Sequence, residues 1–186
     1  MHETHYSPEF WGIPESQEAL PDMAKIDSAM SRAMDYAIAQ YESVKAYMAS
    51  LGVDKPIHIG ETGWATFSNE HYGDTGSRAT DEYKSASFYK KMREWTNANG
   101  ISCFWFEAFD EPWKSAANPL GSENHFGLIN IQAQAKYALW DMVDAGIFEG
   151  LTRDGKTVSK TFDGDSVALM QQVKVPPTLK ETAAGR

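Results

Sequence analysis

The longest regular pattern in the chain is an apolar stripe between Asp22 and Leu51, where hydrophobic side chains recur every three or four positions. This period predicts one long amphipathic helix. Pro21 suits the start of this helix, and Gly52 suits the position just after its last turn. Such a helix covers a parallel sheet and packs its methionines into the core. The stripe consists of Ile26, Met30, Met34, Ala37, Tyr41, Val44, Met48 and Leu51.

Two short apolar runs predict strands on either side of a second helix. The first strand is Pro56–Glu61 and the second is Ile101–Phe109. Between them, a polar loop leads into a helix that Thr80 or Asp81 caps and that Asn99-Gly100 closes. This alternation of helices and strands predicts an α/β fold with a parallel sheet.

Beyond the second strand, the pattern predicts a long loop over Ser115–Asn130 and a third helix over Ala133–Ile147. Loops of this length carry function or are disordered. We expect one domain over residues 1–150 and a C-terminal extension over residues 151–186. The extension is expected to contain a turn at Arg153–Lys156, a short helix near Asp165–Val173 and a frayed end at Thr178–Arg186.

The composition is that of an acidic globular protein. The 186 residues carry a formal net charge of −9, which disfavours nucleic acid because an acidic surface repels phosphate backbones. No run approaches the ~18 apolar residues of a membrane span, and the first residues lack the apolar core of a signal peptide, so a soluble chain is expected. His2 and His5 lack the spacing of a helical metal site, and no metal is predicted. Lone Cys103 is interpreted as a small buried hydrophobe.

Carboxylates follow both predicted strands. Glu61 comes at the end of the first, and the end of the second carries Glu107, Asp110 and Glu111. The carboxyl ends of parallel strands present catalytic groups in barrel enzymes, and two carboxyl groups cleave glycosidic bonds. Strict alternation places Glu61 on the face of Ile59, unless a bulge shifts it. The three acids of the second strand are candidates for substrate contacts or for tuning the pKa of Glu61.

A simpler interpretation competes with this one. On spacing alone, Glu61 is equally consistent with a capping or salt-bridged carboxylate at a strand exit. Trp64, Trp105 and Trp113 would then fill the core, and Lys114 would be a solvated charge. The high aromatic content of 12% favours a cleft that stacks sugars or bases.

Longer motifs at the same positions carry a family resemblance. They run from Ile59 to Trp64 (IGETGW) and from Phe104 to Lys114 (FWFEAFDEPWK), with Thr4-His5-Tyr6 before them and Phe126-Gly127-Leu128 after them. In this order they resemble glycoside hydrolase family 17, the β-1,3-glucanases and β-1,3-glucanosyltransferases. The resemblance covers roughly residues 1–150.

The resemblance implies a (β/α)8 barrel that acts on β-1,3-glucan with retention of configuration, without a metal or an organic cofactor, in a secreted or periplasmic setting. It implies that Glu61 is the nucleophile at the tip of strand seven. Glu107 and Lys114 would hydrogen-bond the sugar or the nucleophile. The residues implied to line the sugar subsites are Tyr6, Trp64 and Trp113.

One part of the family pattern is missing. The family's acid/base glutamate follows an asparagine on strand four, whereas this chain begins near the end of strand six. The expected fold is therefore a partial barrel of about strands seven and eight, and a whole barrel takes about 250 residues. The open sheet, with unpartnered Ile57, Ile59, Cys103 and Trp105, predicts a homo-oligomer that covers it.

Three functions follow from these patterns. The first is a retaining β-glucan hydrolase or transferase whose acid/base comes from a partner chain, with Glu107 or Glu111 as an alternative acid within one chain. The second is a non-catalytic carbohydrate-binding protein that keeps the aromatic subsites. The third is a structural or assembly fragment that binds no sugar.

Overall fold

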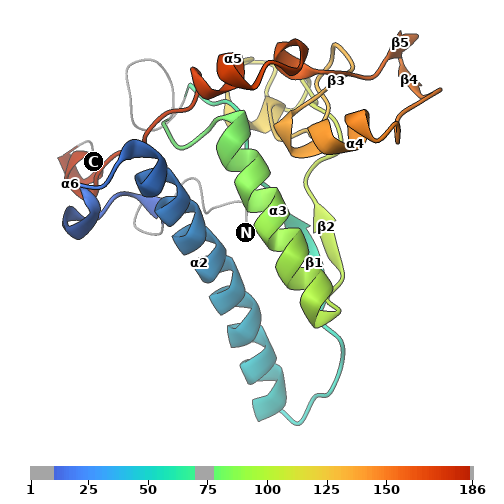
Figure 1. Cartoon of the computed structure of the whole chain (residues 1–186). Coiled ribbons are helices and arrows are strands. Elements are labelled where there is room, and N and C mark those ends of the chain that lie inside the picture. Colours follow the sequence, from blue (N-terminus) through green and yellow to red (C-terminus); the bar gives the residue numbers. More distant parts are fainter. Residues whose placement is uncertain (1–10, 70–77, 185–186) are drawn as a thin grey trace.

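A computed structural model describes residues 11–69 and 78–184. Two long helices lie side by side, with a pair of short strands behind the second helix and a group of short elements beyond its N-terminal end (Figure 1). The main elements are the helices α2 (Asp22–Ser50) and α3 (Glu82–Asn99) and the strands β1 (Ile59–Thr62) and β2 (Cys103–Trp105). Among the described residues, no helix combines the length and the apolar character needed to cross a membrane.

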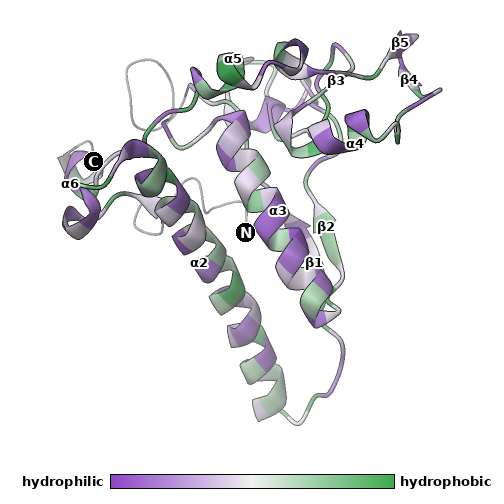
Figure 2. Ribbon diagram, in the orientation of Figure 1, coloured by the Kyte–Doolittle hydropathy of each residue, from purple (hydrophilic) through white to green (hydrophobic). Residues whose placement is uncertain are grey.

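The helix predicted from the apolar stripe is confirmed as α2. It begins at Asp22, and Gly52 follows it with a left-handed φ of 70°. The first half of the stripe, from Ile26 to Ala37, is buried in the core. In the second half Tyr41 still packs against the core, but Val44 is 50% exposed and Leu51 is 61% exposed. Figure 2 shows that hydrophobic segments nevertheless continue along α2 to its last turns.

The second helix is also confirmed as α3. The Asp81 side chain caps its start by accepting a hydrogen bond from the Lys84 amide at 2.8 Å, and Gly100 closes it in the left-handed conformation. Its inner residues Phe88 and Met92 join one hydrophobic core with residues from α2 and β1. This core holds the strand pair against the two helices.

The two strands are parallel neighbours, as predicted, but both are shorter than the apolar runs suggested. The expectation that their apolar side chains lack partners within the chain is wrong for Ile59, Cys103 and Trp105. Ile59 is buried, and Cys103 and Trp105 pack against the same core as α2 and α3. The exposed apolar side chain of this sheet is Phe104, at 64%.

The third predicted helix is broken into shorter pieces. Gln134–Ala135 forms β3, which pairs in parallel with β6 (Ser159–Lys160), and only η4 (Tyr137–Leu139) and α4 (Trp140–Asp144) are helical. Ala133 has a φ of 65°, which is incompatible with a right-handed helix. The strand pairing therefore uses the backbone that the helix would have needed.

The C-terminal extension contains the predicted turn and short helix. A hairpin of β4 (Thr152–Arg153) and β5 (Lys156–Thr157) turns at Asp154-Gly155, where both φ angles are positive. The side chain of Asp165 caps α5 (Ser166–Met170). The described residues also contain the short 3-10 helices η2 (Glu15–Gln17), η3 (Ser122–Asn124) and η5 (Thr161–Gly164).

The prediction of a frayed C-terminus is wrong, because Leu179–Ala184 forms α6. The backbone of Ile13 holds the segment before it, donating to the Pro177 carbonyl and accepting from the Leu179 amide, both at 2.9 Å. Arg78 also forms an ion pair with Glu181 at 2.7 Å. These contacts tie the end of the chain to Ile13 and to the segment before α3.

Candidate active site

The end of β1 carries a bulge that exposes Glu61. Ile59 is aligned with Cys103 and Thr62 with Trp105, so β1 advances three residues where β2 advances two. As a result Ile59 and Thr62 are both buried while Glu61 between them is exposed. Strict alternation would have put Glu61 on the face of Ile59. The sequence pattern allowed for a bulge here, and this bulge is what exposes the Glu61 carboxylate.

Just beyond the bulge, the two strand ends lie very close together. The Phe106 amide donates to the Thr62 carbonyl at 2.7 Å. A Cβ atom at Gly63 would overlap the Phe106 carbonyl oxygen, so this position requires glycine. Gly63, the second glycine of the IGETGW motif, thus lets the segments that carry Glu61 and Glu107 approach each other.

After β2, Glu107, Glu111 and Lys114 form a cluster. The Lys114 Nζ lies 3.0 Å from Glu107 Oε2 and 3.1 Å from Glu111 Oε2, and it sits over the Phe106 ring. The other oxygen of Glu107, Oε1, is buried without a hydrogen-bond partner among the described residues. Burial raises the pKa of Glu107 to about 7, although Lys114 opposes this shift. The cluster therefore holds a carboxyl group that exchanges its proton near neutral pH.

The two tryptophans predicted to line sugar subsites have different environments. Trp113, next to Lys114, is 67% exposed and offers its ring to a ligand. Trp64 is fully buried, its Nε1 donates to the Ala79 carbonyl at 2.9 Å, and its ring packs against Phe88. The prediction that Trp64 lines a subsite is wrong, because a ring enclosed by the core has no face for a sugar. Tyr6 lies outside the described residues.

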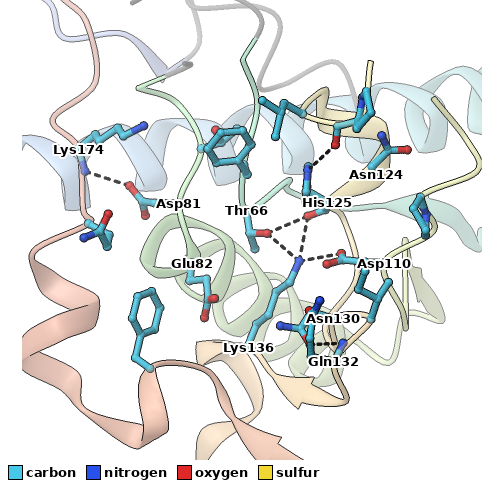
Figure 3. A pocket seen from close by; sticks show the side chains of 18 residues that line it. Thr66, Asp81, Glu82, Asp110, Asn124, His125, Asn130, Gln132, Lys136 and Lys174 are labelled. Carbon is cyan, nitrogen blue, oxygen red and sulfur yellow. Dashed lines mark hydrogen bonds and ion pairs between the residues drawn. The ribbon is translucent and has the colours of Figure 1, made fainter. Parts of the chain in front are cut away.

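Asp110, a predicted substrate contact, forms an enclosed ion pair. It is 5% exposed, and its Oδ1 accepts hydrogen bonds from Lys136 at 2.7 Å and from the Gly127 amide at 2.9 Å. Lys136 in turn donates to Thr66 at 2.7 Å (Figure 3). The pair therefore joins the segments that follow β1 and β2, and its position is that of a structural ion pair.

Lys136 is the functional-site neighbour that sequence reasoning missed. It lies between β3 and η4. Burial lowers the pKa of Lys136, and Asp110 opposes that effect. The sequence signal was a single lysine within the segment predicted to be the third helix, and nothing in the local pattern indicates that it pairs with Asp110. Within residues 11–69 and 78–184, no group of three histidine, cysteine, aspartate or glutamate side chains is placed to hold a metal ion.

Comparison with known proteins gives a consistent result. A solved endo-laminarinase from Formosa Hel1_33_131 superimposes with a TM-score of 0.89 and 58% identity, over 95% of this chain and 45% of that one. A probable glucan endo-1,3-beta-glucosidase of Aspergillus terreus is 34% identical over 42% of this chain and 13% of its own length. A glucan 1,3-beta-glucosidase of Arthroderma benhamiae is 33% identical over 48% of this chain and 29% of its own length.

The chain thus spans less than half of the solved laminarinase and less than a third of these two curated relatives. The model of the family described as glycosyl hydrolases family 17 matches residues 22–140, a range that contains α2, both strands, Glu61 and the Glu107–Lys114 cluster. The resemblance seen in the two motifs is therefore confirmed over most of the chain, and this protein belongs to glycosyl hydrolases family 17.

Proposed function

We propose that this chain supplies the nucleophile side of a β-1,3-glucan cleft, with Glu61 attacking the anomeric carbon in a retaining mechanism. The observation that carries the proposal is the bulge in β1, which exposes Glu61 beside the partner strand that leads to Glu107, Glu111 and Lys114. A retaining glycosidase needs a carboxylate on a rigid support, and a strand end provides one. Trp113 would stack on a sugar ring at the rim of the cleft.

The same proposal assigns the acid/base to a carboxyl group on another strand or chain. In the family pattern this glutamate is on strand four, and the described elements correspond to about strands seven and eight of a partial barrel. On its own the chain would cleave glucan weakly or not at all. Glu107 is the alternative acid within the chain, because its pKa of about 7 keeps it largely protonated in mildly acidic solution.

A fluorinated substrate tests the nucleophile without the acid. In 2-deoxy-2-fluoro-laminaribiosyl fluoride, the anomeric C–F bond breaks and fluoride leaves without being protonated. The electron pair of a Glu61 oxygen forms the new bond to C1, and the ring fluorine slows hydrolysis of the resulting ester. Mass spectrometry of the intact chain and of its peptides measures the added mass and its position.

We expect one covalent glycosyl group on the peptide that contains Glu61, and none in the Glu61→Gln variant. The matched control is Glu94→Gln, which changes an exposed glutamate on α3 and should be labelled like the unmodified chain. Absence of label from the unmodified chain at saturating reagent, or label on a different residue, would contradict the role of Glu61.

Non-catalytic sugar binding is the second candidate. It is favoured by the exposed indole of Trp113, which remains available whatever the state of the carboxyl groups. This function predicts heat of binding for laminaritriose in calorimetry, a loss of that heat in Trp113→Ala, and no covalent label. The labelling experiment therefore separates the two candidates.

We further propose that a second copy of this chain covers its exposed apolar surface. The surface is defined by Val44, Tyr47 and Leu51 at the end of α2 and by Phe104 on β2. Exposed apolar groups of this kind favour association. Light scattering of the purified chain should give more than one copy per particle, and a monodisperse monomer at dilute concentration would refute this assembly.

A further inference from the structure

A cavity of about 630 Å³ lies between the segments that follow the two strands and the C-terminal part of the chain (Figure 3). Its volume falls within the range of small-molecule sites, about 300–1,000 Å³. The lining comes from residues 66–67 and 80–82, from the segment 110–136, and from Phe162, Gln172 and Lys174. Neither Glu61 nor Glu107 is among the lining residues.

Apolar side chains form much of the wall. Phe67 and Leu120 contribute on one side, and Ile131 and Phe162 on others. Phe162 has a φ of 53°, a conformation that bulky residues rarely adopt. Its neighbour Thr161 is held by a hydrogen bond to Glu82 at 2.7 Å. The fold thus maintains a strained backbone at the residue whose ring borders the cavity, a feature that is frequent at ligand sites.

Three polar groups keep hydrogen-bonding capacity toward the cavity. Both hydrogen bonds to Glu82, from Thr161 and from the Tyr137 amide, end on Oε2, and Oε1 has no partner among the described residues. The side-chain amides of Gln132 and Gln172 likewise have no partner in the described part of the chain. Planar carboxyl and amide groups beside an aromatic ring match a ligand that has hydroxyl groups around an apolar ring face.

The charged groups around the cavity are balanced in sign. Asp110 pairs with Lys136 and Asp81 pairs with Lys84. Glu82 and Lys174, which also line the cavity, carry one charge of each sign. Burial lowers the pKa of His125, so this ring is neutral at pH 7. An ionic ligand of either sign would therefore find no excess of opposite charge, which favours a neutral ligand.

We propose that this cavity binds a short neutral saccharide, with a sugar ring against Phe162 and hydroxyl groups at Glu82, Gln132 and Gln172. The choice of a β-1,3-linked glucose oligomer rests on the proposed function of the chain. Bound there, one end of a glucan would be held by the segments 110–136 and 162–174. An apolar compound that carries no hydroxyl groups is the competing occupant.

Nuclear magnetic resonance of the ¹⁵N-labelled chain tests the cavity and the strand-end cleft in one titration. Laminaritriose is added to the full chain, and the side-chain amide signals of Gln132 and Gln172 report on the cavity. The indole N–H of Trp113 reports on the cleft. We expect saturable shifts of both glutamine signals, and a second titration with indole tests the apolar competitor.

Two variants remove the cavity contacts while keeping the fold. Phe162→Gly deletes the ring and suits the positive φ, and Glu82→Gln keeps an oxygen for Thr161 and Tyr137 while replacing the acceptor that faces the cavity. Phe162→Gly should weaken laminaritriose binding at the glutamine signals by about tenfold, the loss expected for one ring contact. Asp163→Gly is the matched control, because Asp163 has a similar φ of 51° and does not line the cavity. It should leave the affinity unchanged.

The possible outcomes separate this proposal from the proposed function. Shifts of Trp113 without shifts of the glutamines would overturn the cavity proposal and leave the cleft intact. Shifts of the glutamines alone, lost in Phe162→Gly, would support the cavity and contradict sugar binding at Trp113. Shifts of the glutamine signals with indole but not with laminaritriose would overturn the saccharide and show that the cavity binds an apolar ligand. No shift with either compound would overturn the cavity proposal.

Discussion

Two pairs of lysine and carboxylate lie in the segments after β2, and their environments differ. Lys114 is 27% exposed, lies 3.0 Å from Glu107, and leaves the Glu107 Oε1 without a hydrogen bond in the described part of the chain. Lys136 is 6% exposed, lies 2.7 Å from Asp110, and donates also to Thr66. The first pair combines a partly exposed lysine with a buried, incompletely hydrogen-bonded carboxyl group, whereas the second is enclosed and well satisfied.

The difference shows that two carboxyl groups of the segment 104–114 have different roles. Glu107 and Asp110 are three residues apart, yet one carboxyl group titrates near neutral pH and the other is held by Lys136 and the Gly127 amide. Buried polar groups with complete hydrogen bonding fix a structure, and an incompletely bonded carboxyl group with a raised pKa is suited to chemistry. The Asp110–Lys136 pair therefore holds in place the segment that carries Glu107 and Lys114.

Breaking the buried pair should have the largest effect. Lys136→Met leaves Asp110 buried without its cation, and removal of one partner of a buried ion pair costs about 3–5 kcal/mol in unfolding free energy. Urea unfolding followed by circular dichroism measures this loss. In the double variant Asp110→Asn with Lys136→Met, most of the stability should return, because neither member of the pair is charged and the asparagine oxygen can still accept from Gly127. A single Lys136→Met variant as stable as the parent would contradict the structural role of the pair.

The next effect concerns the close approach of the two strand ends. Gly63→Ala would place a methyl group against the Phe106 carbonyl oxygen, and overpacking of this kind costs about 1–3 kcal/mol. Gly60→Ala is the matched control within the same motif, because a Cβ there meets nothing within 4 Å and should change stability by less than about 0.5 kcal/mol. Equal stabilities of the two variants in urea would show that the strand ends have room to separate.

The pH dependence of stability sharpens the contrast further. The pKa of Glu107 is raised by burial from 4.5 to about 7, so between these values the folded state holds a proton that the unfolded state has released. The free energy of unfolding should therefore fall as the pH rises from about 4.5 to about 7. Glu107→Gln should flatten this slope, and Glu94→Gln, an exposed change on α3, should keep it. An unchanged slope in Glu107→Gln would assign the pH dependence to another group.

Much of this organisation could be predicted from local sequence. The apolar stripe of α2, the Asp81 cap and the closing Gly100 are short-range signals, and the helices begin and end where these residues stand. The parallel pairing of β1 and β2 followed from the alternation of strand and helix. The motif around Glu61 predicted this residue at the end of a strand, and Glu61 is exposed at the end of β1.

The remaining features depend on contacts between distant residues. The burial of Trp64 is set by packing against Phe88 on α3, and the break of the third helix is set by pairing with β6 far along the chain. The pairing of Asp110 with Lys136 joins residues 26 positions apart. Local patterns give no information on such partners, which is why neither the burial of Trp64 nor the pairing of Asp110 with Lys136 was predicted.

The smallest effect on stability is expected from the pair of Lys114 and Glu107. Lys114→Met removes a partly exposed cation, and pairs of this kind contribute less than about 1 kcal/mol. At pH 5, where Glu107 is mostly protonated, urea unfolding should therefore differ little from that of the parent. The pKa of Glu107 should nevertheless rise, because Lys114 is the group that opposes the effect of burial. A carboxyl titration by nuclear magnetic resonance measures this rise. If the pKa of Glu107 instead fell in Lys114→Met, the lysine would not be stabilising the ionised carboxylate, and the ion pair would not be what opposes the effect of burial.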